Sequence, residues 1–124
     1  MIIYLASPYS HEDSDVVEER VRKSAQAAAK LIQYGHIVFC PVTHSHLIAK
    51  HGALGPFDHD LWMEQDKVWL EKCDLVLVLM LDGWGQSKGV KQELAWAEQM
   101  KKPIVHCSEG SVHCDDFSDL EEVV

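Results

Sequence analysis

Residues 74–93 read DLVLVLMLDGWGQSKGVKQE, so that an apolar run stands directly before a glycine-rich loop and a helical pattern. The run at 74–81 is rich in Leu and Val without polar alternation, which is typical of a strand buried on both faces of a sheet. The residues after the loop, at about 87–101, have helical periodicity. A buried strand, a loop and a helix in this order predict an α/β fold.

The same alternation extends over most of the chain. Three more apolar runs are IIYLA at 2–6, HIVFCPV at 36–42 and PIVHC at 103–107, and two more helical patterns lie at about 15–34 and 58–73. This order predicts a doubly wound, flavodoxin-like or Rossmann-like parallel sheet of four to five strands, with right-handed crossovers and helices on both faces. Residues 43–56, THSHLIAKHGALGP, have the composition of a loop. Since most connections have about 4 to 6 residues, a loop of this length is a candidate binding element.

The length of 124 residues predicts a single domain over residues 1–124. Its last segment, 108–124, is acidic with few apolar residues, which predicts a short helix or a partly disordered tail. No run approaches the roughly 18 consecutive apolar residues of a membrane span. The start, MIIYLA, continues into polar sequence and therefore predicts a first strand rather than a signal peptide. We expect no membrane partner and a cytoplasmic location.

The formal net charge of -9 argues against a nucleic-acid polymer as partner, because affinity for such polymers comes largely from Lys and Arg contacts to phosphates. One small anionic ligand is compatible with this charge, since backbone N–H groups at a helix N-terminus can hold a phosphate. The four cysteines form no C-x-x-C pair, so we predict reduced thiols. The expected partner is a small molecule.

Most chemically active side chains follow the predicted strands. Open parallel sheets bind ligands at the carboxyl ends of their strands. In this chain those ends are ASPYSHED at 6–13, PVTHSHL at 41–47, LDGWGQSKG at 81–89 and HCSEGS at 106–111. We therefore predict the functional site at that edge of the sheet.

Two carboxylates fall on inward faces of predicted helices. At about 100° per residue, Glu93 shares the side of its helix with Ala97 and Met100, and Asp66 shares its side with Leu70 and Cys73. Each carboxylate taken alone is compatible with a bond to a loop N–H or with an edge position that reaches solvent. Carboxylates are seldom buried without a partner, and burial raises their pKa. Two of them near one sheet edge indicate a site that uses them.

Two other polar residues in the loop at 82–89, Asp82 and Ser87, are each compatible with two interpretations. Asp82 ends the most hydrophobic strand, either as a third functional carboxylate or as an Asx-type turn over Gly83. Ser87 is either the N-cap of the next helix or a ligand for a phosphate or sugar hydroxyl. The sequence GWGQSKG is out of register with the G-x-G-x-x-G fingerprint, and the chain has no G-x-x-x-x-G-K-[ST] motif. No cofactor is predicted.

His44 and His46 form an H-x-H pair that is compatible with zinc binding. The loop offers no Cys or acidic third ligand close by, so contact with an organic ligand, or solvation, is the preferred interpretation and no metal ligand is assigned. A Ser-His-Asp triad has no G-x-S-x-G elbow to support it.

Three elements taken together, IYLASPYS at 3–10, the inward Asp66 eight residues before Asp74, and D-G-x-x-x-S-x-G-V-x-x-E at 82–93, resemble the nucleoside 2-deoxyribosyltransferase superfamily. That superfamily includes deoxynucleoside 5'-monophosphate N-glycosidases, and this chain looks closest to a small, poorly characterised branch. The resemblance covers about residues 1–106 and is strongest at 82–97. The chain departs from it in the HSH loop and at Lys91 and Gln92, where glycine and an aromatic residue are common.

The resemblance implies a compact doubly wound fold, a homodimer or higher homo-oligomer, and a glutamate nucleophile at Glu93. It implies that Asp66 and Asp82 help to hold the base and the sugar and that Ser87 contacts a 5'-phosphate. The remaining expected substrate contacts come from the first strand and its loop, from the HSH loop and from the glycines of the motif: Tyr4, Ser7, Tyr9, His44, His46, Gly83 and Gly89.

The chemistry fits these residue types. Cleavage of an N-glycosidic bond develops positive charge at the anomeric carbon, which a carboxylate such as Glu93 can stabilise or attack. A protonated Asp66 suits the departing base. We therefore expect an enzyme that cleaves or transfers at the N-glycosidic bond of a 2'-deoxynucleoside or its 5'-monophosphate. The alternatives are a non-catalytic nucleotide-binding or sensing module and a metal-dependent hydrolase built on the HSH loop.

Overall fold

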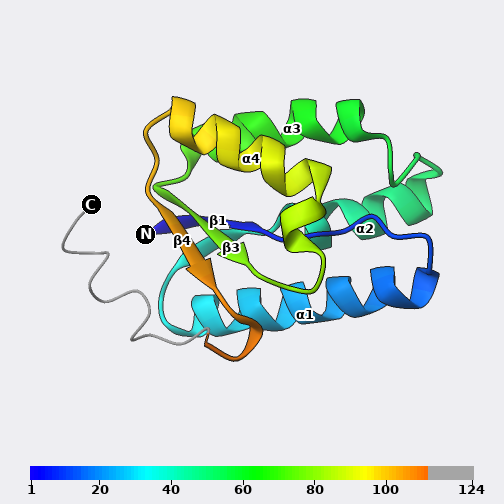
Figure 1. The fold of residues 1–124 in the computed structure, drawn as a ribbon, viewed down its shortest axis with the longest axis horizontal. Coiled ribbons are helices and arrows are strands. Elements are labelled where there is room, and N and C mark those ends of the chain that lie inside the picture. Colours follow the sequence, from blue (N-terminus) through cyan, green and yellow to red (C-terminus); the bar gives the residue numbers. More distant parts are fainter. Residues whose placement is uncertain (112–124) are drawn as a thin grey trace.

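The computed structural model describes residues 1–111, and its centre is a sheet of four parallel strands in the order β2-β1-β3-β4 (Figure 1). The strands are β1 (Ile2–Ala6), β2 (Ile37–Phe39), β3 (Leu75–Leu79) and β4 (Ile104–Cys107). The two central strands pair from Ile3 opposite Leu75 to Ala6 opposite Val78. The predicted parallel sheet is confirmed.

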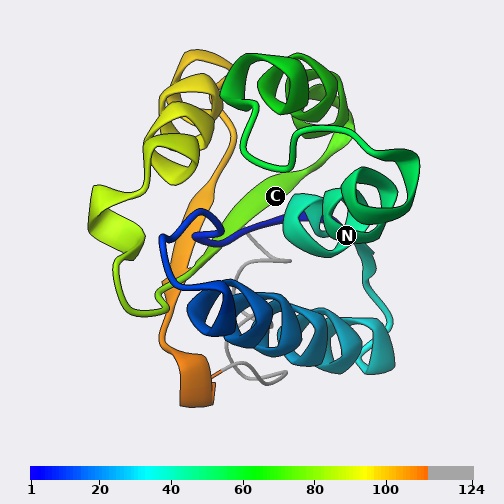
Figure 2. The same cartoon turned by 90° about the vertical axis from the view of Figure 1, so that its right-hand side faces the viewer.

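Helices cover both faces of this sheet, as predicted. Within residues 1–111 they are α1 (Ser14–Gln33), α2 (Pro41–Gly52), α3 (His59–Lys72) and α4 (Lys88–Gln99), with short 3-10 turns η1 (Trp84–Gln86) and η2 (Glu109–Ser111). Figures 1 and 2 show α1 on one face and α3 beside α4 on the opposite face. Most of the segment for which a helix or a disordered tail was predicted, residues 112–124, lies outside the described residues.

Side-chain caps fix where three of the helices begin. Asp13 accepts a hydrogen bond from the Asp15 N–H at 2.9 Å before α1, and Asp58 accepts from the Leu61 N–H at 3.2 Å before α3. Ser87 caps α4. Each cap satisfies a backbone N–H that has no partner inside the helix. These starting points set which residues of each helix face the sheet.

The prediction of a loop at 43–56 is wrong for most of its length, because Pro41–Gly52 form α2. The predicted strand at 36–42 is correspondingly too long and ends at Phe39. Pro41 explains both errors: it cannot donate to a strand ladder, but its fixed φ suits the first position of a helix. The helix ends where Ala53 adopts the left-handed conformation, at φ 56°. The apolar residues of α2 show only weak helical periodicity, so the sequence pattern did not predict this helix.

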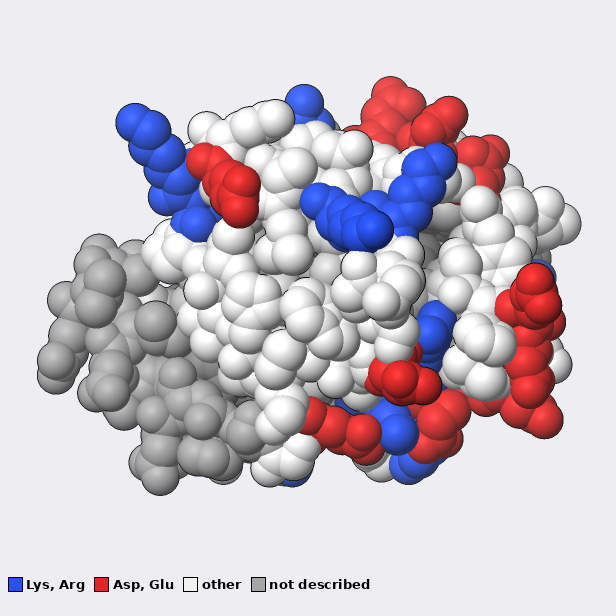
Figure 3. Space-filling view, viewed as in Figure 1, with Lys and Arg blue, Asp and Glu red and all other residues white. Residues whose placement is uncertain are grey.

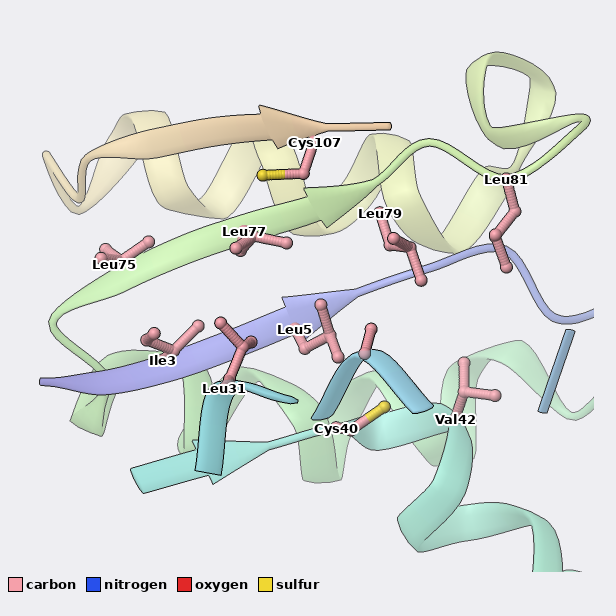
Figure 4. Packing of buried hydrophobic residues seen from close by; sticks show 11 residues of the cluster. Ile3, Leu5, Leu31, Cys40, Val42, Leu75, Leu77, Leu79, Leu81 and Cys107 are labelled. Carbon is pink, nitrogen blue, oxygen red and sulfur yellow. The ribbon is translucent and has the colours of Figure 1, made fainter. Parts of the chain in front are cut away.

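The core consists of two apolar clusters, one on each face of the sheet. β3 contributes to both, because its Leu side chains point to one face and its Val side chains to the other. Figure 4 shows the cluster on the α1 face, where Leu31 of α1 lies beside Ile3 of β1. All five residues of β3 are buried. The absence of polar alternation at 74–81 therefore correctly predicted a strand that is buried on both faces.

The topology creates a crevice at the carboxyl ends of the central strands. After β1 the chain crosses by α1 to β2, and after β3 it crosses by α4 to β4 on the other side. The two departing loops therefore separate at the point where the strand order reverses, which is the usual place for a ligand in such sheets. Figure 2 looks onto this edge, with the loop after β1 in dark blue.

Surface charge on the face shown in Figure 3 is mixed. Lys and Arg side chains gather over α4, while Asp and Glu side chains lie along the edge formed by α1 and at the right-hand end. None of the helices in residues 1–111 has the length and apolarity needed to cross a membrane.

Candidate active site

A cavity of about 680 Å³ opens at this edge, within the usual size range of small-molecule sites. Its walls come from the loop after β1, from α1, α2 and α3, and from the segment between β3 and α4. Seven of the predicted site residues line it: Tyr9, Asp66, Asp82, Gly83, Ser87, Gly89 and Glu93.

Glu93 lies at the bottom of the cavity, on the inward face of α4. The Ser87 cap starts the helix so that Glu93 shares a face with the buried Val90 and Ala97, and its own exposure is 3%. The Tyr4 hydroxyl, on β1 behind it, donates a short hydrogen bond to Glu93 Oε2. The pKa of Glu93 is raised to about 8 as the net result of three effects: burial raises it most, the Tyr4 hydrogen bond lowers it and the charge of Asp66 raises it. The predicted inward orientation is confirmed.

Asp66 is the second buried carboxyl group of the cavity. It lies on α3 with 5% exposure, and burial raises its pKa to about 7. Its charge opposes ionisation of Glu93, so the two carboxyl groups are close enough to interact. Two carboxyl groups with raised pKa in one cleft are characteristic of sites that perform acid, base or nucleophilic chemistry.

The N-terminus of α4 forms another wall. Ser87 Oγ accepts from the Val90 N–H at 3.2 Å, so the N-cap interpretation is confirmed, and Ser87 also lines the cavity. Gly89, in the first turn, lines it as well. The exposed N–H groups and the helix dipole at this end favour an anionic group.

Arg20 was not among the predicted residues, although it lines the cavity. Its guanidinium donates to the Ser10 and Asp82 carbonyl oxygens, both at 2.8 Å, and so joins the loops after β1 and β3. Gly83 makes room for it, because a Cβ there would lie 2.6 Å from Arg20 Nη2. Partial burial lowers the pKa of Arg20 and the Asp82 charge opposes this effect. Position 20 lies on a helix distant in sequence from the motif, so no local pattern marks it.

Four predicted contact residues do not line this cavity. Tyr4 lies behind Glu93, and the Ser7 hydroxyl is buried in a 2.8 Å hydrogen bond with Ser24. The His44 ring packs against Phe39. His46 bonds to Tyr9 and Glu18 and lines a neighbouring cavity.

The H-x-H pair is therefore split between two environments. His44 and His46 are both on α2, and they have different neighbours. Within residues 1–111, no group of three or more His, Cys, Asp or Glu side chains has the arrangement needed to hold a metal ion.

Part of the cavity wall is aromatic and apolar. It consists of Phe57, Trp62 and Met63, from α3 and the segment before it, and Met63 Cε lies 3.8 Å from the place of a Cβ on Gly89. The Trp62 indole N–H donates to the Gly55 carbonyl at 2.9 Å, which fixes the ring. Apolar spacing in the sequence does not distinguish a core position from a pocket wall, so it did not identify these side chains.

Comparisons with known proteins show similarity to a protein family and to solved structures. The family described as "Domain of unknown function (DUF1937)" matches residues 1–109. A solved structure of a 2-deoxyribosyltransferase from the psychrotolerant bacterium Bacillus psychrosaccharolyticus aligns with a TM-score of 0.64 and 22% identity, over 90% of this chain and 74% of that one. No curated protein matches. The predicted deoxyribosyltransferase-like fold is therefore confirmed.

Proposed function

The chain belongs to the family described as Domain of unknown function (DUF1937), and we propose that it cleaves or transfers at the N-glycosidic bond of a 2'-deoxynucleoside 5'-monophosphate. The observation that carries this proposal is the pair of buried carboxyl groups, Glu93 and Asp66, in one cavity, with the Tyr4 hydroxyl bonded to Glu93. The shared fold with a 2-deoxyribosyltransferase supports glycosyl transfer as the general chemistry.

Glu93 is the proposed nucleophile. A Glu93 oxygen bonds to the anomeric carbon while the bond from that carbon to the base nitrogen breaks, which gives a covalent glycosyl-enzyme. The Tyr4 hydrogen bond stabilises the ionised form that this attack requires, because it lowers the pKa of Glu93.

Asp66 is the proposed acid. Its pKa, raised by burial to about 7, keeps part of the Asp66 population protonated near neutral pH, and this form can give its proton to the departing base nitrogen. The resulting Asp66 carboxylate then takes a proton from water, whose oxygen attacks the anomeric carbon and releases Glu93. Attack by a second base in place of water gives transfer instead of hydrolysis.

Two groups of lining residues fit two parts of a nucleotide. The aromatic side chains of Phe57 and Trp62 suit a planar base. Arg20, Lys88 and the N-terminus of α4 suit a 5'-phosphate. Asp82, which also lines the cavity, would hold a sugar hydroxyl. This charge distribution favours the monophosphate over the free nucleoside.

A second candidate, a nucleotide-binding or sensing module, is favoured by one observation. Burial raises the pKa of Glu93 to about 8, and a protonated carboxyl group is a poor nucleophile. In that case the cavity would bind the nucleotide without turning it over.

Two further properties complete the proposal. We infer a homodimer or higher oligomer, because α2 and α3 expose large apolar side chains, Leu47, Ile48, Val68 and Trp69, of the kind that interfaces bury. A cytoplasmic location fits the buried thiols of Cys40 and Cys73, since disulfides are rare in reducing compartments.

The test is base release from a panel of deoxynucleosides and their 5'-monophosphates, with and without a free acceptor base. Wild type is compared with Glu93→Ala and with Glu98→Ala, an exposed glutamate on the same helix. Release that needs Glu93 and not Glu98 would support the enzyme. Nucleotide binding without release by the wild type would support the sensing module.

A further inference from the structure

Three side chains form a hydrogen-bonded chain that ends at the wall of the cavity. His46 Nε2, on α2, lies 3.1 Å from Glu18 Oε1 on α1, and His46 Nδ1 lies 2.8 Å from the hydroxyl of Tyr9 in the loop after β1. Glu18 is 65% exposed and the His46 side chain 14%. The chain therefore runs from solvent inward to Tyr9, which lines both the candidate active site and the neighbouring cavity beside His46.

The donors and acceptors fix the direction of this chain. A carboxylate can only accept, so the bond to Glu18 places the proton of His46 on Nε2. In the neutral imidazole Nδ1 is then the acceptor, and the Tyr9 O–H must donate to it. The lone pairs of the Tyr9 oxygen remain available, because His46 is the partner found for this hydroxyl within residues 1–111.

Aromatic packing places the Tyr9 ring beside a residue proposed to hold the base. The centroid of the Tyr9 ring lies 5.7 Å from that of His46, edge-to-face, and 5.4 Å from that of Phe57. Phe57 belongs to the aromatic wall described above. A hydroxyl that is held by His46 and framed by Phe57 cannot rotate freely to suit different ligands.

We propose that Glu18 and His46 are positioning residues that hold the Tyr9 hydroxyl as a hydrogen-bond acceptor for an exocyclic amino group of the base. This inference rests on the proposed function and narrows its substrates to nucleotides with an amino-bearing base. A site built to bond an N–H group discriminates against an analogue that lacks it, because the site's own polar group then loses its partner.

The first test needs no ligand. Nitrogen-15 NMR measures which imidazole nitrogen of His46 carries the proton. In the wild type the proton is expected on Nε2, and this preference is expected to disappear in Glu18→Gln. The neighbouring Glu19→Gln, which removes an ion-pair partner of Arg22, should leave it unchanged. A wild-type imidazole with its proton on Nδ1 would overturn the proposal.

The ligand test compares dissociation constants for matched 5'-monophosphates: 2'-deoxyadenosine with purine 2'-deoxyriboside, and 2'-deoxycytidine with its 2-pyrimidinone analogue. The wild type should prefer the amino-bearing member of at least one pair by about tenfold. Tyr9→Phe and His46→Ala should remove this preference, whereas His46→Asn, whose amide can take the place of Nδ1, should restore part of it.

The outcomes separate the two proposals. A preference that Tyr9→Phe leaves intact would overturn the role of Tyr9 while leaving the glycosidic function standing. Binding of none of these nucleotides would overturn both the proposed function and the base assigned to Tyr9, even if the Nε2 proton of His46 is found as expected.

Discussion

The Tyr4 hydroxyl on β1 donates a hydrogen bond to the carboxyl group of Glu93 on α4, across 89 positions of sequence. Both side chains are buried, at 0% and 3% exposure. The contact joins the central strand to the helix that carries the proposed nucleophile, and it lowers the pKa of Glu93 against the effect of burial. The predictions for activity and pH dependence start from this pair.

Tyr4→Phe should impair activity without unfolding the protein. Loss of the hydrogen bond raises the pKa of Glu93 further, so less of the ionised form is present at neutral pH. A hydrogen bond to a charged group contributes about 1.5 to 3 kcal/mol, which corresponds to a fall of about 10- to 100-fold in kcat/KM. The pH-rate profile should move to higher pH. Tyr34→Phe, on an exposed tyrosine, is the control, and an unchanged profile in Tyr4→Phe would contradict the role of this bond.

Stability should fall as pH rises. The folded state raises the pKa of Glu93 from 4.5 to about 8 and that of Asp66 from 3.8 to about 7, so it binds more protons than the unfolded chain between those values. The free energy of unfolding therefore decreases from about pH 4 to about pH 8.

Glu93→Gln removes one of the two titrating groups and tests that dependence. It should raise Tm by several degrees above about pH 8 and change it little near pH 4. Thermal unfolding over this pH range measures the effect, with Glu98→Gln as the matched exposed control. A Tm difference independent of pH would show that Glu93 does not titrate as described.

Gly83→Ala should weaken phosphate recognition by displacing Arg20. Gly83 has φ of 86°, and the added Cβ would lie 2.6 Å from Arg20 Nη2. We expect a rise of about tenfold or more in KM for the monophosphate and little change for the nucleoside, because a charge-assisted hydrogen bond contributes about 1.5 to 3 kcal/mol. Gly85→Ala, where a Cβ meets nothing within 4 Å, is the control. Equal losses for both substrates would instead indicate a general distortion of the loop.

Leu77→Ala should destabilise the fold without altering the site chemistry. Leu77 is fully buried in β3, and truncation of such a side chain costs about 2 to 5 kcal/mol. Denaturant unfolding measures this cost. Val68→Ala, on a side chain that is 56% exposed, should stay within about 0.5 kcal/mol of wild type. A similar loss in both variants would contradict the placement of Leu77 in the core.

The sheet and the two inward carboxyl groups could be predicted because local patterns report them. The run at 74–81 lacks polar alternation because both faces of β3 are covered. The helical period alone was enough to predict that Glu93 and Asp66 face inward. These inferences need only the residues of one element.

Other features depend on contacts between distant segments. Arg20 reaches the site because α1 passes beside the loop after β3, and no pattern around position 20 records that contact. His46 was expected to contact the ligand directly, but the helix around Pro41–Gly52 turns it toward Tyr9 and Glu18 instead. Such placements follow from tertiary packing and not from spacing in the sequence.

The most direct test of the central claim is to look for the covalent intermediate on Glu93. Wild-type protein is mixed with a deoxynucleoside 5'-monophosphate that it turns over, quenched rapidly and digested, and the peptides are mapped by mass spectrometry. In the wild type, the peptide that contains Glu93 is expected to gain the mass of one deoxyribosyl phosphate, and in Glu93→Ala the corresponding peptide is expected to show no such gain. Undiminished base release by Glu93→Ala, with no modified peptide in the wild type, would contradict it.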